Sequence, residues 1–190
     1  KCNAIRFCSS PKEIETAVDD LFTMSVRGQY VSSVRVEEKL TIAEEYYLSI
    51  TYDTNIKQPV LLFSTEGGVD IEDVAEKNIQ RVPLSISKPR IPLFTQDDGV
   101  QYIAQKLWEC FLQEDARVVE INPLVKTQDN LWVAADAKVA IDDDAFFRHD
   151  QWKVLEARTM MGRLPTQREI AVKDIDRGDG YYRGTAGKYI

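Results

Sequence analysis

The chain has 190 residues, of which 44% are hydrophobic and 29% charged, so it can bury one sizeable core or two small ones. Its net charge of −7 argues against a broad basic surface for nucleic acid, and no apolar run approaches the about 20 residues that span a membrane. Three cysteines without metal-ligand spacing fit a reducing compartment, so we expect a cytoplasmic protein with neither a nucleic-acid nor a membrane partner.

The first third of the chain predicts a helix followed by an antiparallel sheet. Two serines before Pro11 favour a helix start, and apolar residues recur at helical spacing as far as Phe22. Short runs rich in apolar residues then predict three strands, at residues 31–37, 43–53 and 60–64.

The middle of the chain predicts two further helices on either side of an irregular stretch. A turn at 65–70 contains two glycines that permit a close backbone bend, and it leads into a short helix expected at 71–77. Prolines interrupt regular structure between residues 82 and 95. A longer helix is then expected to start at Asp97 or Asp98 and to run to about residue 113.

The most informative stretch is an expected hairpin, with strands at 118–125 and 131–139 joined by a polar turn. Glu120 and Asn122 are two residues apart, so they point to the same side of their strand, and Asp136 can approach them from the returning strand. Such oxygen ligands are those that bind Mg²⁺ together with nucleotide phosphates.

The simpler alternative for this hairpin is a half-buried ribbon whose polar residues face water. The apolar neighbours of Glu120 and Asp136 favour the metal site, because carboxylates among such residues are costly to desolvate without a compensating cation. After the hairpin, a charged stretch with a weaker helical signal covers residues 151–176, and glycines and tyrosines predict a loop or linker at 177–187.

Four linked motifs stand out by their order and spacing: Glu37 before Ile42-Ala-Glu-Glu-Tyr-Tyr-Leu48, then Ser64-Thr-Glu-Gly-Gly-Val-Asp-Ile-Glu72, Glu120-Ile-Asn-Pro-Leu-Val125 and Asp136-Ala-Lys138. Together they resemble the ATP-grasp region of the succinyl-CoA synthetase β subunit and ATP citrate lyase superfamily. The resemblance extends over nearly the whole chain. It implies an α+β ATP-grasp fold, truncated at its N-terminus, with a mostly antiparallel sheet and flanking helices.

The resemblance also implies roles for individual residues. Glu37 and Glu45 match positions that hold the adenine and ribose of the nucleotide, ATP or GTP. Asn122 and Asp136 match the Mg²⁺ ligands, and Glu120 matches a catalytic carboxylate close to the transferred phosphoryl group. The role of the turn Glu66-Gly67-Gly68 is left open, because its spacing assigns no chemistry.

The family reaction implies an ATP-dependent acid–CoA ligase that works through a phosphohistidine and an acyl phosphate. The partners would be an α subunit or fused equivalent carrying the phosphohistidine, with CoA and a di- or tricarboxylic acid as substrates. The alternatives are an ATP citrate lyase or citryl-CoA synthetase subunit, or a non-catalytic ATP-grasp-like docking module. His149 is expected in an exposed segment, without a catalytic role.

The family pattern implies residues 1–145 as an incomplete nucleotide-binding region and residues 146–190 as a helical, charged connector to a missing C-terminal CoA-ligase domain. The stretch Lys1-Cys-Asn-Ala-Ile5 stands where family members have an Ala-Gly-Gly run, and Leu40 replaces a small polar residue. The preference between ATP and GTP therefore stays open. The fragment alone is expected to be inactive and to bind Mg-ATP weakly at most.

Overall fold

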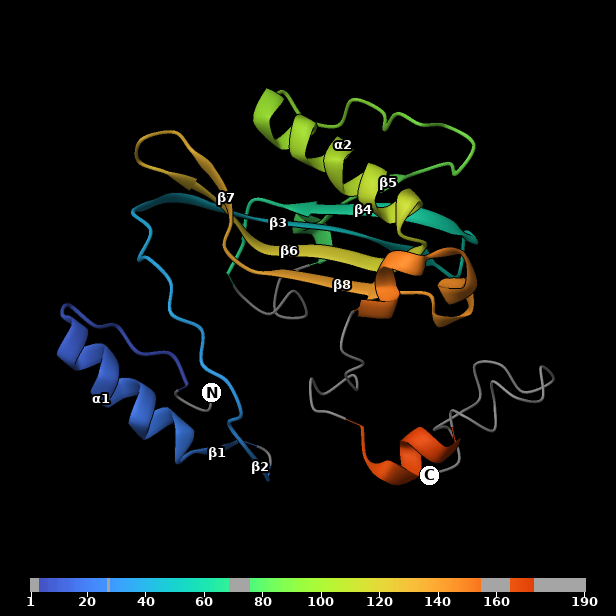
Figure 1. Ribbon diagram of the computed structural model, residues 1–190. Helices are drawn as coiled ribbons and strands as arrows, with labels where there is room; N and C mark the ends of the chain where they lie inside the picture. The colour runs from blue at the N-terminus through green and yellow to red at the C-terminus, as the bar shows by residue number, and fades with distance from the viewer. Residues whose placement is uncertain (1–3, 27, 69–75, 155–164, 173–190) are drawn as a thin grey trace. The chain divides into compact units, whose positions relative to one another are not determined.

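The computed structural model describes residues 4–26, 28–68, 76–154 and 165–172 (Figure 1). It forms two compact units, Lys1–Thr41 and Ile42–Ile190. These units do not test the predicted boundary near residue 146, which stays a prediction. The expected helix at 71–77 and the loop at 177–187 fall mainly or wholly outside the described residues.

The first unit contains one helix and one short hairpin. Helix α1 spans Pro11–Phe22, with Pro11 in its first turn and the Ser10 side chain accepting a hydrogen bond from the Glu13 N–H at 3.3 Å. Strands β1 (Ser25–Val26) and β2 (Gln29–Tyr30) then pair antiparallel. The serine cap and the proline were visible in the sequence, and the predicted helix is confirmed.

The predicted strand at 31–37 is wrong, because residues 31–41 adopt neither helix nor strand. Their β-branched residues have the right propensity, but Val36 is exposed and pairs with no strand among the described residues. Strand propensity reflects how well a side chain packs on a half-buried sheet, so it does not act without a paired neighbour.

The second unit is an antiparallel sheet in the order β5-β4-β3-β6-β7, with β8 also paired to β6. Its long central strands are β3 (Ile42–Asp53) and β6 (Ala116–Thr127), which pair with each other. The other strands are β4 (Gln58–Ser64), β5 (Gln80–Pro83), β7 (Trp132–Ala134) and β8 (Ala137–Ile141). The pairing of β3 with β4 confirms the predicted antiparallel partners.

Strand β5 extends by two residues into the stretch 82–95, which the sequence predicted to be irregular. Val82 and Pro83 pair with Leu61 and Val60 at the end of the β4 ladder. A proline is tolerated in β5 because this is an edge strand, whose outer side needs no backbone donor. A short 3-10 helix, η2 (Glu76–Asn78), precedes it.

Helix α2 (Asp98–Gln113) lies across one face of the sheet (Figure 1) and packs on β3 and β6. The Asp97 side chain caps its first turn, accepting hydrogen bonds from Gly99 and Val100 N–H, as the sequence predicted. Alternate residues of the strands and one face of the helix build the core: Tyr46, Leu48, Ile50, Leu61, Phe63, Val100, Ala104, Leu107, Trp108, Phe111, Val119, Ile121 and Leu124. Burial of this apolar surface is the main stabilising term of the unit.

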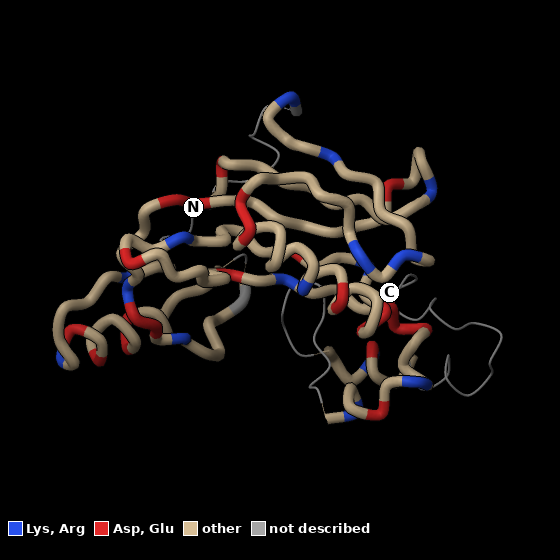
Figure 2. Tube along the Cα trace, turned by 90° about the horizontal axis from the view of Figure 1, so that it is seen from above, with Lys and Arg blue, Asp and Glu red and all other residues tan. Residues whose placement is uncertain are grey.

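Charged residues of both signs are distributed along the described chain (Figure 2). Over that part, Lys and Arg do not form one continuous run along the trace. None of the helices in the described part of the chain is both long enough and apolar enough to cross a bilayer.

Two 3-10 segments, η3 (Asp143–Arg148) and η4 (Asp150–Val154), follow β8. Side chains at their junction make hydrogen bonds to Asp115, the residue before β6. Arg148 donates two hydrogen bonds to Asp115, at 2.7 and 2.6 Å. The Nε2 atom of His149 lies 2.6 Å from Asp115 Oδ2, and the His149 ring stacks on Trp152 with centroids 3.8 Å apart. The first part of the predicted connector is therefore attached to the connection between α2 and β6.

The prediction that His149 is exposed is wrong, since only 6% of this residue is accessible. Its neighbours Arg148 and Asp150 are exposed, which made the segment resemble a solvated loop. The stacking partner Trp152, three positions along the chain, is what buries the ring.

Acid should weaken this attachment. Hydrogen bonds from Arg148, followed by that of His149, lower the pKa of Asp115 from 3.8 to about 2. A carboxyl whose folded-state pKa is depressed stabilises the fold above its unfolded-state pKa, so this contribution is present above about pH 4 and is lost as the pH falls towards 2. We expect Asp115→Asn to lower stability at neutral pH and to flatten the pH dependence of stability between pH 4 and 2, measured by urea unfolding.

Asn is a suitable replacement at this position because residue 115 has a positive φ of 42°, which Asn tolerates better than most residues. The exposed Asp144, in the same segment, supplies the control substitution Asp144→Asn, which should leave the pH dependence unchanged. Equal slopes for Asp115→Asn and the unmodified protein would contradict the assignment.

Candidate functional site

The face of the sheet opposite α2 carries polar side chains of β3 and β6, beside apolar residues such as Val60 and Leu62. Along β3, Tyr46, Leu48 and Ile50 belong to the core, so the alternating residues Glu45, Tyr47 and Ser49 point to the other face. Ser49 is paired with Glu120 of β6, which places Glu120 on the same face. The sheet thus collects carboxylate and hydroxyl groups on one side.

The returning strand of the predicted hairpin keeps one register although it is interrupted. Leu124 pairs with Ala134 in β7, and Ile121 pairs with Ala137 in β8. Between these pairs, the Asn122 N–H donates to the Asp136 carbonyl at 3.2 Å. Asn122 and Asp136 are therefore directly opposed, and directly opposed residues of an antiparallel pair project to the same face with Cβ atoms about 4.5–5.5 Å apart.

Glu120, Asn122 and Asp136 consequently share one side of the hairpin, with Lys138 opposite Glu120. Glu120 and Asn122 are half-buried and Asp136 is exposed. The Asp136 carboxylate also accepts a hydrogen bond from the Ala137 N–H at 2.9 Å. This arrangement leaves the three side chains at the solvent edge of the polar face.

Glu120 is held by a tyrosine that the sequence did not single out. The Tyr47 hydroxyl donates to Glu120 Oε2 at 3.0 Å, and only 3% of Tyr47 is exposed. Burial, with a smaller effect of the Glu120 charge and an opposing contact with Ser49, raises the pKa of Tyr47 to about 12. Tyr47 therefore stays a hydrogen-bond donor at neutral pH. Its spacing of two from Glu45 was the available signal that it shares the polar face.

The turn whose role the sequence left open lies against this site. The Gly67 N–H donates to the Glu45 carbonyl at 3.3 Å, and the Gly68 N–H donates to Asn122 Oδ1 at 2.9 Å. The turn thereby joins the half-buried Glu45 to Asn122, although the two are far apart in sequence. No sequence pattern could have shown this contact, because it forms only when β3, β4 and β6 are assembled.

The donor set fits a Mg²⁺ ion. Mg²⁺ prefers oxygen ligands and is bound by one or two carboxylates, with phosphate and water completing its octahedron. Asn122 and Asp136 supply an amide and a carboxylate oxygen from adjacent strands, and Glu120 adds a second carboxylate beside them. The described residues contain no cluster of three or more His, Cys, Asp or Glu side chains suited to a metal ion, so any site here depends on the amide and on ligand phosphates.

Glu37 belongs to the first unit, whereas the other predicted site residues, Glu45, Glu120, Asn122 and Asp136, belong to the second. It is exposed, and its Oε1 lies 2.6 Å from Arg35 Nε. The strand in which the sequence placed it is absent, as described above.

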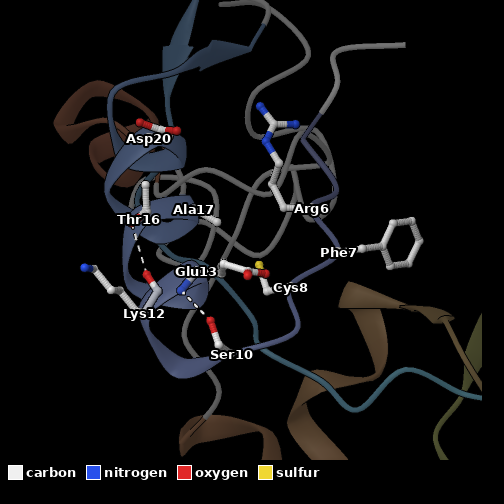
Figure 3. Close-up of a pocket in the computed structure, with 9 residues that line it drawn as sticks. All are labelled: Arg6, Phe7, Cys8, Ser10, Lys12, Glu13, Thr16, Ala17 and Asp20. Carbon is white, nitrogen blue, oxygen red and sulfur yellow. Dashed lines mark hydrogen bonds between the residues drawn. The ribbon is translucent and has the colours of Figure 1, made fainter.

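A separate pocket of about 440 Å³ lies in the first unit, against α1 (Figure 3). Arg6 and Lys12 are among its lining residues, as are the acidic Glu13 and Asp20. The Glu13 carboxylate also accepts a hydrogen bond from the Ser9 N–H at 2.8 Å, which completes a helix-capping box with Ser10. These contacts give Ser10 and Glu13 a structural role at the start of α1, and we assign no ligand to the pocket.

Comparison with known proteins identifies the fold. The family model described as an ATP-grasp domain matches residues 1–126. The chain belongs to the ATP-grasp family. The predicted α+β ATP-grasp fold, with its mostly antiparallel sheet, is thereby confirmed.

The curated relatives of this ATP-grasp chain are β subunits of ADP-forming succinate–CoA ligases. The protein from Methanocaldococcus jannaschii is 42% identical over an alignment of 165 residues, and the match covers 79% of this chain and 45% of that protein. The protein from Methanothermobacter thermautotrophicus is 34% identical over an alignment of 171 residues, and the match covers 82% of this chain and 46% of that protein. The chain thus spans about half the length of the curated relatives it matches, and the resemblance to this superfamily is confirmed.

A solved structure of ATP citrate lyase from Methanothrix soehngenii, in complex with citrate and coenzyme A, has the same fold. The two superpose with a TM-score of 0.63 at 21% identity, covering 89% of this ATP-grasp chain and 42% of that chain. At 21% identity this similarity shows the fold alone and says nothing about which acid this chain's protein would use.

Proposed function

We propose that the full-length protein is an ATP-dependent acid–CoA ligase of the succinate–CoA ligase type, and that this chain forms its nucleotide and Mg²⁺ side. The observation that carries the proposal is the polar face of the hairpin, where Glu120, Asn122 and Asp136 lie together and the 67–68 turn connects them to Glu45. The relation to β subunits of ADP-forming succinate–CoA ligases supports the same conclusion.

Each residue has a chemical role in this proposal. The carboxylates of Glu37 and Glu45 accept hydrogen bonds from the nucleoside, for which a ribose diol is a suitable donor. Asn122 and Asp136 hold the Mg²⁺ ion, which neutralises phosphate charge in the transition state. Glu120 lies close to the transferred phosphoryl group, and Tyr47 fixes the orientation of its carboxylate.

The remaining steps belong to a partner. The γ-phosphoryl group passes to a histidine of an α-type subunit or fused equivalent, releasing ADP. The acid carboxylate then takes the phosphoryl group to form an acyl phosphate, and the CoA thiol displaces phosphate to form the thioester. His149 is buried between Asp115, Gln151 and Trp152, so it is not the histidine that carries phosphate. Succinate is the proposed acid, and the cytoplasm is the proposed compartment.

Nucleotide binding tests the proposal directly. In calorimetric titrations of the full-length protein with Mg-ATP and Mg-GTP, we expect Glu45→Gln to weaken binding by about 10- to 100-fold. This range corresponds to losing one or two hydrogen bonds to a charged group. The matched control is Glu44→Gln, the neighbouring carboxylate on the α2 side of the same strand, which contacts Tyr46 and should leave affinity unchanged.

Two outcomes would overturn this reading. Absence of any Mg-dependent nucleotide binding by the full-length protein would favour a non-catalytic docking module. Equal losses for Glu44→Gln and Glu45→Gln would mean that the substitutions act through the strand and not through the nucleotide.

A further inference from the structure

The two glycines of the 65–68 turn make different contacts, and both contacts are made by backbone atoms. Gly67 N–H donates to the carbonyl of Glu45, which anchors the turn on β3. Gly68 N–H donates to the Asn122 side chain on β6, at 2.9 Å. Through this pair of donors the turn spans two neighbouring strands at the level of the candidate metal site.

A side chain is unfavourable at both positions, for different reasons. A Cβ atom at residue 67 would lie 2.6 Å from the backbone nitrogen of Tyr46, which cannot move away. A Cβ atom at residue 68 would meet Glu45 Oε2, the end of a flexible side chain that can shift, but Gly68 has a φ of +73°, which side-chain-bearing residues rarely adopt. The close approach therefore requires glycine at position 67, and the backbone conformation favours glycine at position 68.

The contact from Gly68 fixes which atom Asn122 presents. A side-chain amide carries an acceptor oxygen with two lone pairs and a donor nitrogen. Because Gly68 N–H donates to Oδ1, the amide cannot rotate its NH₂ group into that place without opposing two donors. An amide oxygen with two lone pairs can accept a hydrogen bond from an outer-shell partner and also bind a cation, which is how such partners orient metal ligands.

We propose that Gly68 is a positioning residue, which orients the Asn122 carboxamide as an oxygen ligand for Mg²⁺ and sets the Glu45 carboxylate beside it. Gly67 supports this by anchoring the turn to β3. The inference rests on the proposed function, because it assumes that Asn122 binds the cation. It adds that the backbone of Gly67 and Gly68 connects the strand that carries Glu45 to the Asn122 side chain.

The first test is the Mg²⁺ dependence of activity in the full-length protein. Alanine keeps the N–H but disfavours the positive φ of residue 68, so Gly68→Ala should displace this donor from Asn122 and raise the Mg²⁺ concentration for half-maximal activity by about 10- to 100-fold, the usual effect of disturbing an outer-shell partner. Saturating Mg²⁺ should largely restore kcat. The control is Gly28→Ala, because Gly28 has a similar φ of +79° and nothing within 4 Å of its added Cβ. It carries the same backbone strain without the contact.

The outcomes separate this inference from the proposed function. If Asn122→Ala leaves the Mg²⁺ dependence unchanged, the proposed function fails and this inference fails with it. If Asn122→Ala shifts the dependence while Gly68→Ala behaves like Gly28→Ala, only this inference fails.

A second measurement needs no variant and therefore does not depend on whether Gly68→Ala folds. In the full-length protein labelled with ¹⁵N-glycine, the Gly68 amide resonance should shift on addition of Mg²⁺ and broaden on addition of Mn²⁺. The Gly28 resonance should do neither. An unperturbed Gly68 amide under saturating Mn²⁺ would overturn the assignment.

Discussion

Asn122→Ala and Asp136→Ala should each reduce thioester formation by the full-length protein by roughly 10²–10³-fold, while the fold is retained. Each substitution removes one of the two protein ligands that we assign to the cation, and phosphoryl transfer depends almost entirely on positioning and on neutralising phosphate charge. The readout is thioester absorbance with ATP, CoA and succinate in the presence of the phosphohistidine-bearing partner, with citrate as the competing acid.

The polar turn of the same hairpin supplies the control. Gln128 is an exposed amide residue between β6 and β7, and Gln128→Ala should leave turnover unchanged. Circular dichroism and thermal unfolding should show that the two site variants stay folded. If either variant keeps turnover within twofold of the unmodified protein, the assignment of Asn122 and Asp136 as ligands of the cation is wrong.

The largest effect on stability is expected from Trp108→Ala. Trp108 is 1% exposed, stacks on Phe111 with ring centroids 5.6 Å apart, and donates its indole N–H to the Lys88 carbonyl at 3.0 Å. Truncation would open a cavity between α2 and the sheet and would leave that carbonyl without its donor. Buried Trp→Ala changes cost about 3–5 kcal/mol, which we expect in the free energy of unfolding from urea titration.

Tyr102, on the same helix, is the matched control, because 64% of it is exposed. Tyr102→Ala should change the free energy of unfolding by less than about 1 kcal/mol. If Trp108→Ala proved equally mild, the packing of α2 on the sheet would not be the main source of stability in this unit.

The sequence predicted those elements whose signals are local. The helices α1 and α2 start where Ser10 and Asp97 cap them, and β3, β4 and β6 are long runs rich in apolar residues. In the hairpin, the predicted strand at 131–139 corresponds to β7 and β8, which share one register but are separated at residues 135–136. Periodicity and capping suffice for such elements because they depend on near neighbours in the chain.

Most of the features that sequence reasoning missed depend on partners distant in the chain. The 31–37 segment has strand propensity but no paired strand among the described residues, whereas β5 forms despite Pro83 because β4 offers it an edge. His149 is buried by Asp115 and Trp152, which no pattern at residue 149 reveals. In the candidate site, alternation indicated that Glu120 and Asn122 share a face, but the contact of Gly68 with Asn122 required the assembled sheet.

Because β7 and β8 share one register on β6, the hairpin fixes which residues lie opposite each other, including the Asn122 amide and the Asp136 carboxylate at its centre. Asn122 faces Asp136 because the connection from Thr127 to Leu131 has a defined length, closed by the Thr127 N–H on the Leu131 carbonyl at 2.9 Å. Adding or deleting a single residue there would turn every later side chain to the opposite surface. Insertions of odd length in this connection should therefore be excluded, whereas substitution of its exposed residue Gln128 should be tolerated.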